Sequence, residues 1–277
     1  LGHLVTDKNR TRAMSFYVIS MALGFTIGPI IIWFSGVSAI APFIIISLIQ
    51  AFSVLPLILL WQVQPSHSNE APHSPFFLLK AGPKIAAGCI LVGIIDLSII
   101  SLIPALVQKT PSSVLYLAFL LPIVGALGNV VIQYPLAVFS EKVGNNKTGY
   151  CVVIFGSSLC ALLPFFLNST IISVVLAFFG SGIIYFMYTL SLSMLSKQFK
   201  GAKLISANAS FVMLFEISSL IGPLIAGILL DKFLNIGLSA FLISVGFAYL
   251  LVTVIKDLQK QRIQKKTTAK GIKKSKN

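Results

Sequence analysis

Eight long runs of apolar residues, separated by short polar segments, divide the chain. Each run is close to the length of about 20 residues that a helix needs to cross the hydrocarbon core of a bilayer. The pattern therefore predicts an all-α fold, a polytopic membrane helix bundle with eight transmembrane helices. The predicted spans are residues 13–34, 40–62, 85–107, 113–139, 149–167, 170–195, 207–230 and 237–255.

The composition agrees with a membrane protein and argues against an enzyme. Of the 277 residues, 56% are hydrophobic and 10% are charged, and the mean hydropathy is +0.95. Cys89, Cys151 and Cys160 lie inside apolar runs without metal-site spacing, and the histidines are scattered through polar segments. Since no nucleophilic or metal-binding set can be assembled from these residues, we expect neither catalysis nor a cofactor.

Lysine and arginine are distributed unevenly between the loops. When successive loops are assigned alternately to the two sides of a membrane, 19 of the 21 basic residues share a side with the amino terminus, and Lys109 and Lys232 fall on the other. Basic loops remain in the cytoplasm, so both termini of this chain are predicted to be cytoplasmic. We expect the basic tail, residues 256–277, to contact anionic lipid rather than nucleic acid, and to be helical only briefly.

Two segments resemble each other at a constant offset. "AMSFYVISMALGFTIGPII", which starts at Ala13, aligns with "ANASFVMLFEISSLIGPLI", which starts at Ala207, so that one Gly-Pro pair falls on the other. The two copies are six predicted helices apart. This period is expected for a transporter built from two parallel six-helix halves, and it predicts that the Gly-Pro pairs lie at matching depths in the membrane.

The loop "QYPLAVFSEKVGNNK" resembles a signature of the major facilitator superfamily, of the type G-x-L-x-D-R-x-G-R-R, which lies between helices eight and nine. In that family a glycine permits a tight cytoplasmic turn, an acidic residue pairs with a helix end, and basic residues hold the inner gate. The matching positions here are Glu141, Lys142, Gly144 and Lys147.

The same loop also departs from the signature. Ala137 stands where the first glycine is expected, and Asn145 and Asn146 replace the basic pair. These departures predict a weakened gate. The segments "DKNRTRAMSFYVISMALGFTIGP" and "YTLSLSMLSKQFKGAKLISANASFVMLFEISSLIGPLIAG" resemble, more narrowly, the bacterial YcaD-like branch of the superfamily.

The resemblance implies a domain organisation in which this chain holds helices 5 to 12 of a twelve-helix fold, with four helices preceding Leu1 in the full-length protein. The polar segment "QVQPSHSNEAPHSP" agrees with a linker between the halves. We expect the two helices before the linker to pack beside the six that follow it. The expected parts are residues 1–62, the last two helices of the amino-terminal half; 63–84, a cytoplasmic linker; 85–255, the complete carboxy-terminal half; and 256–277, the tail.

Two carboxyl groups fall inside predicted spans. Asp96 lies near the middle of the span 85–107, and Glu216 lies within the span 207–230. A carboxylate at such a depth costs about 2.5 to 3.5 kcal/mol, so it normally faces a bundle interior, a partner or a water-filled path. We expect both to point inward and to titrate protons or bind a cation. The alternative is a protonated carboxyl that serves packing, hydrogen bonded to Ser98 or Ser218.

Weaker signals come from other residues within the spans. Asn129 and Gln133 are one turn apart, and Tyr185 and Tyr188 are three residues apart, so each pair is a candidate for lining a substrate cavity. Small residues and prolines allow close helix contact and bending. The predicted helix-packing motif consists of Gly24, Gly28, Pro29, Gly222 and Pro223.

These patterns favour one function and leave an alternative. We expect part of a secondary active transporter of the bacterial inner membrane, which moves a small solute by alternating access and is coupled to protons. Its expected partners are the lipid bilayer and a small-molecule substrate, and the chain is expected to be monomeric. The alternative is a transport-inactive remnant, because two helices of the first half cannot close a two-lobed cavity.

Overall fold

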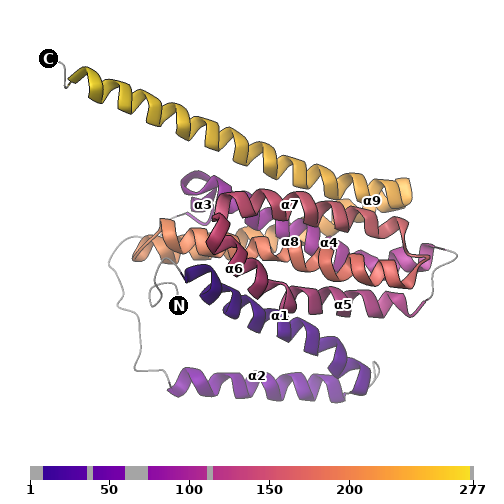
Figure 1. Ribbon diagram of the computed structural model, residues 1–277. Helices are drawn as coiled ribbons and strands as arrows, with labels where there is room; N and C mark the ends of the chain where they lie inside the picture. Colours follow the sequence, from indigo (N-terminus) through magenta and orange to yellow (C-terminus); the bar gives the residue numbers. More distant parts are fainter. Residues whose placement is uncertain (1–8, 36–39, 60–73, 111–114, 275–277) are drawn as a thin grey trace.

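The computed structural model describes residues 9–35, 40–59, 74–110 and 115–274, and helices make up nearly all of them (Figure 1). These helices confirm the predicted all-α class. Their bounds are Arg10–Ser35 (α1), Ala41–Leu59 (α2), Phe77–Ala81 (α3), Pro83–Lys109 (α4), Leu117–Val131 (α5), Gln133–Val143 (α6), Asn145–Leu162 (α7), Leu163–Phe165 (the 3-10 helix η1), Thr170–Gln198 (α8) and Ala202–Lys274 (α9).

Several of the described helices can cross a membrane by length and composition. Four of them qualify as they stand, namely α4, α7 together with η1, α8 and α9, and the pair α5 and α6 is a fifth candidate. The predicted spans 207–230 and 237–255 both lie in α9. The prediction of eight crossings for the whole chain is therefore still open, while the polytopic membrane fold agrees with these helices.

The predicted span 113–139 is bent within the part that the structure describes. The axes of α5 and α6 differ by 42° across a break at Ile132. Pro135 explains the break, because it has no N–H to donate to the carbonyl of Val131 and its ring crowds that carbonyl. The bend changes the direction in which polar residues on either side of it point.

A second break divides α9. Leu234 has a φ of 50° and a ψ of −139°, which are not helical values, so two helical segments meet there. Beyond the break, Asn235 Nδ2 donates a hydrogen bond to the carbonyl of Pro164 (2.9 Å), and Ser239 Oγ donates one to the carbonyl of Ala161 (2.7 Å). These bonds attach the second segment of α9 to α7 and η1.

The basic tail differs from its prediction. Instead of a short helical extension, α9 continues as a helix to Lys274, and Figure 1 shows this yellow segment projecting away from the other helices. Lysine, arginine, glutamine and alanine are good helix formers, and a segment that extends an existing helix avoids the cost of nucleation. Both effects favour a longer helix than the charge pattern alone suggested.

Helices α4 to α9 form one bundle, which we call the lobe. In its middle α8 packs against α4, α5 and α7, while α4 packs along α9. Glycines allow the closest approaches: a Cβ on Gly182 of α8 would lie 2.6 Å from the carbonyl oxygen of Gly128 on α5. Such backbone contact between helices is typical of membrane bundles. In lipid the hydrophobic effect does not drive helices together, so small residues that allow close van der Waals packing stabilise their association.

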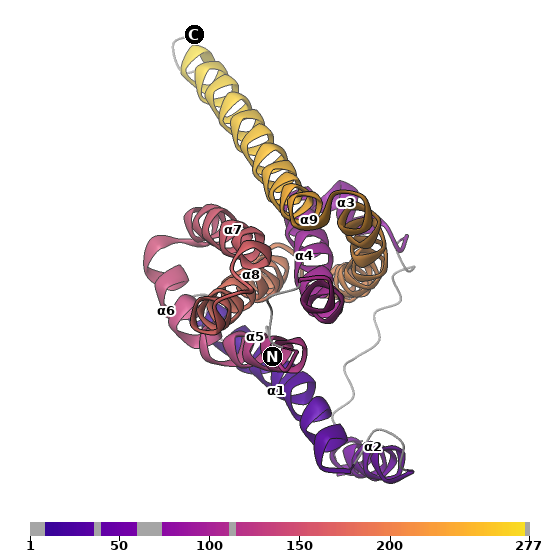
Figure 2. The same ribbon diagram turned by 90° about the vertical axis from the view of Figure 1, so that its right-hand side faces the viewer.

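The first two helices lie beside the lobe, as expected. α1 packs against α5, α6 and α8, and α2 packs against α1. Figure 2 shows α2 at the outer side of α1, away from the lobe. Apart from Pro42, the apolar side chains described in α2 are exposed, among them Phe43, Phe52 and Ile58. A bilayer or further helices would cover such a surface.

The predicted packing glycines have different surroundings. A Cβ on Gly222 would lie 2.7 Å from Cα of Ile94, so α4 and α9 touch there through their backbones. A Cβ on Gly24 or Gly28 would meet nothing within 4 Å among the described residues, and the side chain of Pro29 lies outside them. The packing role of the first Gly-Pro pair, and its matching depth with the pair at Gly222 and Pro223, remain predictions.

Substituting alanine at two glycines of α9 tests the contact between α4 and α9. Gly222→Ala forces the two backbones apart, and we expect it to destabilise the lobe by about 1 to 3 kcal/mol. Gly227→Ala is the matched control, because its Cβ would meet one side-chain atom, Leu102 Cδ2, at 3.7 Å. Its higher helix propensity makes it neutral or stabilising. The measurement is the unfolding midpoint in lipid nanodiscs; equal midpoints for the two variants would contradict the contact.

Candidate functional site

A carboxylate near the end of α6 holds the first turn of α1. Glu141 accepts one hydrogen bond from the backbone nitrogen of Arg12 (3.2 Å) and another from Nε of the same arginine (2.5 Å). The first turn of a helix has unpaired N–H groups and favours negative charge, so Glu141 satisfies both requirements. Glu141 also raises the pKa of the Arg12 guanidinium above its ordinary value, mainly through the hydrogen bond and then through its charge.

The same turn of α1 is attached to α8. Thr11 Oγ1 and Ser193 Oγ are hydrogen bonded at 2.8 Å, and Nη1 of Arg10 donates a bond to the carbonyl of Ser196 (3.3 Å). Sequence reasoning missed these contacts: Arg10 and Thr11 lie in a segment that resembles the YcaD-like branch, but no local pattern indicates that their partners are on α8. The resemblance implied that the acidic residue pairs with a helix end, and Glu141 lies at such an end, that of α1.

Two of the remaining signature residues, Gly144 and Lys147, line an open groove. Gly144 has a φ of 97°, a value that suits glycine, at the turn between α6 and α7. Glu141, Gly144, Lys147 and Lys197 are among the residues that line a groove of about 660 Å³. Lys142 is exposed and is not among them. The groove therefore lies directly beside the contact between Glu141 and α1.

Asp96 lies in the interior of the lobe on α4. Its side chain is 2% exposed and hydrogen bonds with the side chain of Asn129 on α5. Oδ1 of Asp96 and Oδ1 of Asn129 have no hydrogen-bond partner among the described residues. The inward orientation predicted for Asp96 is confirmed, with Asn129 as a direct neighbour.

Gln133 belongs to a different contact. Its Oε1 accepts a hydrogen bond from Thr189 Oγ1 on α8 (2.6 Å), and both side chains are buried. The sequence placed Asn129 and Gln133 on one face, one turn apart. The break at Ile132 separates them, so Asn129 joins α5 to α4 while Gln133 joins α6 to α8.

Tyr185 and Tyr188 stack on each other in α8. Their ring centroids are 5.8 Å apart and the rings are nearly parallel, at 6°. Tyr188 also meets Phe211 and Phe215 of α9 edge to face, at centroid distances of 5.0 and 5.2 Å. Both tyrosines are almost fully buried, so the predicted pair forms an aromatic cluster between α8 and α9.

Glu216 does not point into the lobe, which corrects the expectation that both carboxyls would. Its side chain is exposed, with exposed Val212 and Leu220 one turn to either side on the same face of α9. The lobe helices leave this face of α9 uncovered. Phe215, the residue before Glu216 in α9, meets Tyr188 of α8 edge to face.

Sequence reasoning missed Tyr17 as a member of this region. Tyr17 lies on α1 and is 45% exposed, and α1 packs on α8, the helix that carries Tyr185 and Tyr188. A tyrosine within an apolar span was the available signal, but only the packing of α1 on α8 shows which residues it meets. Residues before and after the linker thus meet at one place.

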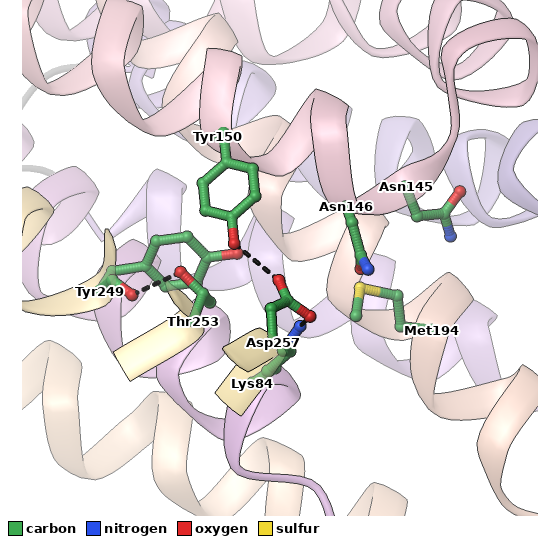
Figure 3. Close-up of a pocket in the computed structure, with 8 residues that line it drawn as sticks. All are labelled: Lys84, Asn145, Asn146, Tyr150, Met194, Tyr249, Thr253 and Asp257. Atoms are coloured by element: carbon green, nitrogen blue, oxygen red, sulfur yellow. Dashed lines mark hydrogen bonds and ion pairs between the residues drawn. The ribbon is translucent and has the colours of Figure 1, made fainter. Parts of the chain in front are cut away.

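A separate polar cluster ties three helices together at one end of the lobe. Figure 3 shows Asp257 of α9 between Lys84 of α4, with which it forms an ion pair, and Tyr150 of α7, whose hydroxyl donates a hydrogen bond to Oδ2 of Asp257 (2.7 Å). In the same view Thr253 Oγ1 donates to the carbonyl of Tyr249 (2.9 Å). The cluster fixes the point where the basic tail leaves the lobe.

Comparison with known proteins identifies the family. The profile of the Major Facilitator Superfamily matches residues 1–187 and again residues 125–276. The chain is 23% identical to YfkF of Bacillus subtilis, an uncharacterized MFS-type transporter, over 86% of this chain and 62% of that protein. It is 24% identical to YcaD of Salmonella enteritidis, another uncharacterized MFS-type transporter, over 89% and 64%.

The chain thus spans a little less than two thirds of the length of these relatives. The matches confirm both the superfamily and the YcaD-like branch that the motifs indicated, and the relatives are named as transporters rather than enzymes. The chain therefore belongs to the Major Facilitator Superfamily, as a multi-pass protein of the bacterial inner membrane.

Proposed function

We propose that the chain forms the larger part of a secondary active transporter that moves a small solute across the inner membrane by alternating access, coupled to protons. One observation carries the proposal: Asp96 is buried inside the lobe, and no cationic side chain is paired with it in the described structure. The family matches favour a transporter over a transport-inactive remnant.

The environment of Asp96 supports proton coupling. An ionised carboxylate in an apolar interior carries a large desolvation cost, and one hydrogen bond from Asn129 offsets part of it. Binding a proton removes the charge and with it most of the cost. When water reaches the site from one side of the membrane, hydration lowers the free-energy cost of the ionised form, and the proton leaves to that side.

The contact of Glu141 with α1 serves as the cytoplasmic gate in this proposal. It joins α1, from the expected amino-terminal half, to α6 in the lobe. The chain would then comprise residues 1–62 from the first half, a cytoplasmic linker at 63–84, the second half at 85–255 and the cytoplasmic tail at 256–277. A transporter of this type works as a monomer, because both halves of the cavity belong to one polypeptide.

The placement of the charges supports cytoplasmic termini. Lys84, Lys147 and Lys197 lie at the same end of the lobe, around the two polar pockets that share Asn145 and Met194. Lys109 pairs with Asp231 at the far end of α4, beside the break in α9. The end with the greater number of lysines is the cytoplasmic one under the positive-inside rule.

Infrared spectroscopy tests whether Asp96 carries the proton. A protonated carboxyl in an apolar site gives a carbonyl band distinct from those of carboxylates, and we expect such a band in the chain reconstituted in nanodiscs. Asp96→Asn should remove it while the amide preserves the contact with Asn129. Asp231→Asn, which changes an exposed carboxyl, should leave the band intact. If the band persists in Asp96→Asn, Asp96 is not the proton carrier.

A charge swap tests the gate. Glu141→Arg and Arg12→Glu each break the pair, and we expect each to widen the separation of spin labels at Ser20→Cys and Val143→Cys in pulsed electron paramagnetic resonance. Because the Arg12 side chain is 36% exposed, water screens the pair in part, and the effect should be modest, roughly a severalfold change in population.

The double variant Arg12→Glu with Glu141→Arg should restore the distance only in part. The swapped pair recovers the salt bridge, but the backbone N–H of residue 12 no longer has a carboxylate acceptor. A double variant as wide as the single variants would show that the Arg12–Glu141 ion pair does not hold the two helices together.

Thiol labelling of the natural full-length protein tests alternating access itself. Val212, exposed one turn before Glu216, is replaced by cysteine in a background from which all native cysteines, among them Cys89, Cys151 and Cys160, have been removed. A membrane-impermeant maleimide should label it from the cytoplasmic side and, in other molecules, from the outer side. Ile243→Cys, on the exposed apolar face of the second α9 segment, is the control and should remain unlabelled. Labelling of position 212 from one side alone would overturn alternating access.

A further inference from the structure

The groove beside the start of α7 combines positive charge with a place at the edge of the membrane. We propose that it binds the phosphate headgroup of an anionic phospholipid, held by Lys147 of α7 and Lys197 of α8. The ligand is a lipid that surrounds the protein and not a transported solute, so the site does not depend on the function proposed above.

The size of the groove suits a small polar group. Its volume of about 660 Å³ lies within the range of about 300 to 1,000 Å³ that is typical of small-molecule sites. Residues from the end of α6, the first turn of α7 and the end of α8 line it. Three helices of the lobe therefore form its walls, and a headgroup that enters it meets polar side chains from each of them.

The two lysines give the groove an excess of positive charge. Lys147 and Lys197 have no hydrogen-bond or ion-pair partner in the part of the chain that the structure describes. Glu141 also lines the groove, but its charge is balanced by the ion pair with Arg12. The groove thus holds two lysine charges without a counter-ion, and a phosphate would supply one.

Uncharged donors add to the two lysines. Gly144 precedes α7, so no side chain caps this helix, and its first three N–H groups have no acceptor among the described residues. Such N–H groups and the helix dipole favour a phosphate. Ser140 Oγ donates a hydrogen bond to Oδ1 of Asn145 (3.2 Å), which leaves the amide hydrogens of Asn145 free for a ligand.

The groove lies at the depth of the lipid phosphates. α8 has 29 residues, which at about 1.5 Å per residue extend over about 43 Å. A bilayer with its headgroup layers is about 40 to 45 Å thick, so the ends of α8 reach those layers. Lys197 is the last residue but one of α8 and therefore lies at headgroup level. This position favours a phospholipid over a soluble phosphate compound as the ligand.

An apolar surface leads from the groove toward the membrane interior. Val143 lines the groove, and Phe139 lies one turn earlier on the same face of α6; the two side chains are 39% and 43% exposed. Acyl chains attached to a phosphate in the groove would lie along this face, whereas a soluble phosphate compound would leave it uncovered. Cationic and apolar surfaces thus adjoin each other in the order in which a phospholipid carries its phosphate and its chains.

Fluorescence quenching by brominated lipids tests the proposal at the groove itself. Phe139→Trp is introduced into the 277-residue chain after its two native tryptophans have been replaced by phenylalanine, and the protein is reconstituted in vesicles. Quenching by phosphatidylglycerol with brominated chains is compared with quenching by phosphatidylcholine with the same chains. We expect the anionic lipid to be preferred about fivefold or more next to position 139, because each lysine near the surface attracts it.

Matched variants separate the groove from the general attraction of a basic protein to anionic lipid. Lys147→Gln together with Lys197→Gln should reduce the preference to nearly onefold. Both lysines are exposed and unpaired in the described structure, so the variant is expected to fold. Lys200→Gln removes the charge of an exposed lysine that does not line the groove, and it should leave the preference unchanged.

A second reporter position checks that the preference is local. Phe155 is 63% exposed on α7, ten residues beyond Asn145, where α7 begins, and so lies about 15 Å deeper in the membrane. A tryptophan at position 155, in place of the one at position 139, should be quenched equally by the two lipids.

Three results would overturn the lipid site. The first is equal quenching by both lipids at position 139. The second is a preference that survives the loss of both lysines or is equally strong at position 155, because it would then come from the charge of the whole protein. The third is displacement of brominated phosphatidylglycerol by excess glycerol 3-phosphate at matched ionic strength, which would identify a site for soluble phosphate. None of these measurements involves transport, so they are independent of alternating access.

Discussion

A carboxyl group at membrane depth must be hydrogen bonded, neutralised or reached by water, and this constraint accounts for much of the arrangement of the lobe. Asp96 meets the constraint by burial beside Asn129, which couples α4 to α5. Glu216 differs, because it lies on a face of α9 that the lobe leaves uncovered. The two carboxyl groups therefore have different surroundings: Asp96 is inside the lobe, and Glu216 is at its surface.

The helix breaks distribute the remaining polar groups around α8. Without the bend at Ile132, Asn129 and Gln133 would share a face and compete for one partner. With it, Asn129 turns to Asp96 on α4 and Gln133 turns to Thr189 on α8. Each buried side chain obtains one partner, and one polar atom on each has no hydrogen-bond partner among the described residues. Such partly satisfied buried atoms carry a free-energy cost, because the low dielectric of the interior makes an unpaired polar group expensive.

Much of the fold could be predicted from the sequence, because apolar length and basic loops report directly on membrane crossing. The all-α class, the long apolar helices and the buried Asp96 followed from local patterns, while the pairing of an acidic residue with a helix end followed from the resemblance to the superfamily. The exposure of Glu216 did not, because a symmetric apolar helix gives no periodic signal for its outward face. The separation of Asn129 from Gln133 was missed because Pro135 was not weighed as a helix breaker, although the sequence contains that signal. The partner of Glu141 and the surroundings of Tyr17 depend on long-range packing of α1, which no local motif encodes.

α8 connects the stacked pair Tyr185 and Tyr188 with the contact between Glu141 and α1. It carries Tyr185, Tyr188 and Thr189 near its middle and Ser193 and Ser196 toward its end, and the last two are bonded to the first turn of α1. A straight helix transmits a shift at one end to the other with little loss, because its backbone hydrogen bonds resist compression. If α1 moves away from Glu141, its first turn either breaks its hydrogen bonds with Ser193 and Ser196 or pulls the end of α8 with it. In the second case the stacked tyrosines move with α8. In the transporter proposed above, closure of the gate and the position of the stacked tyrosines would then change together, because one helix carries both, and a ligand that bound one position of α8 more tightly would shift the gate by that difference in affinity.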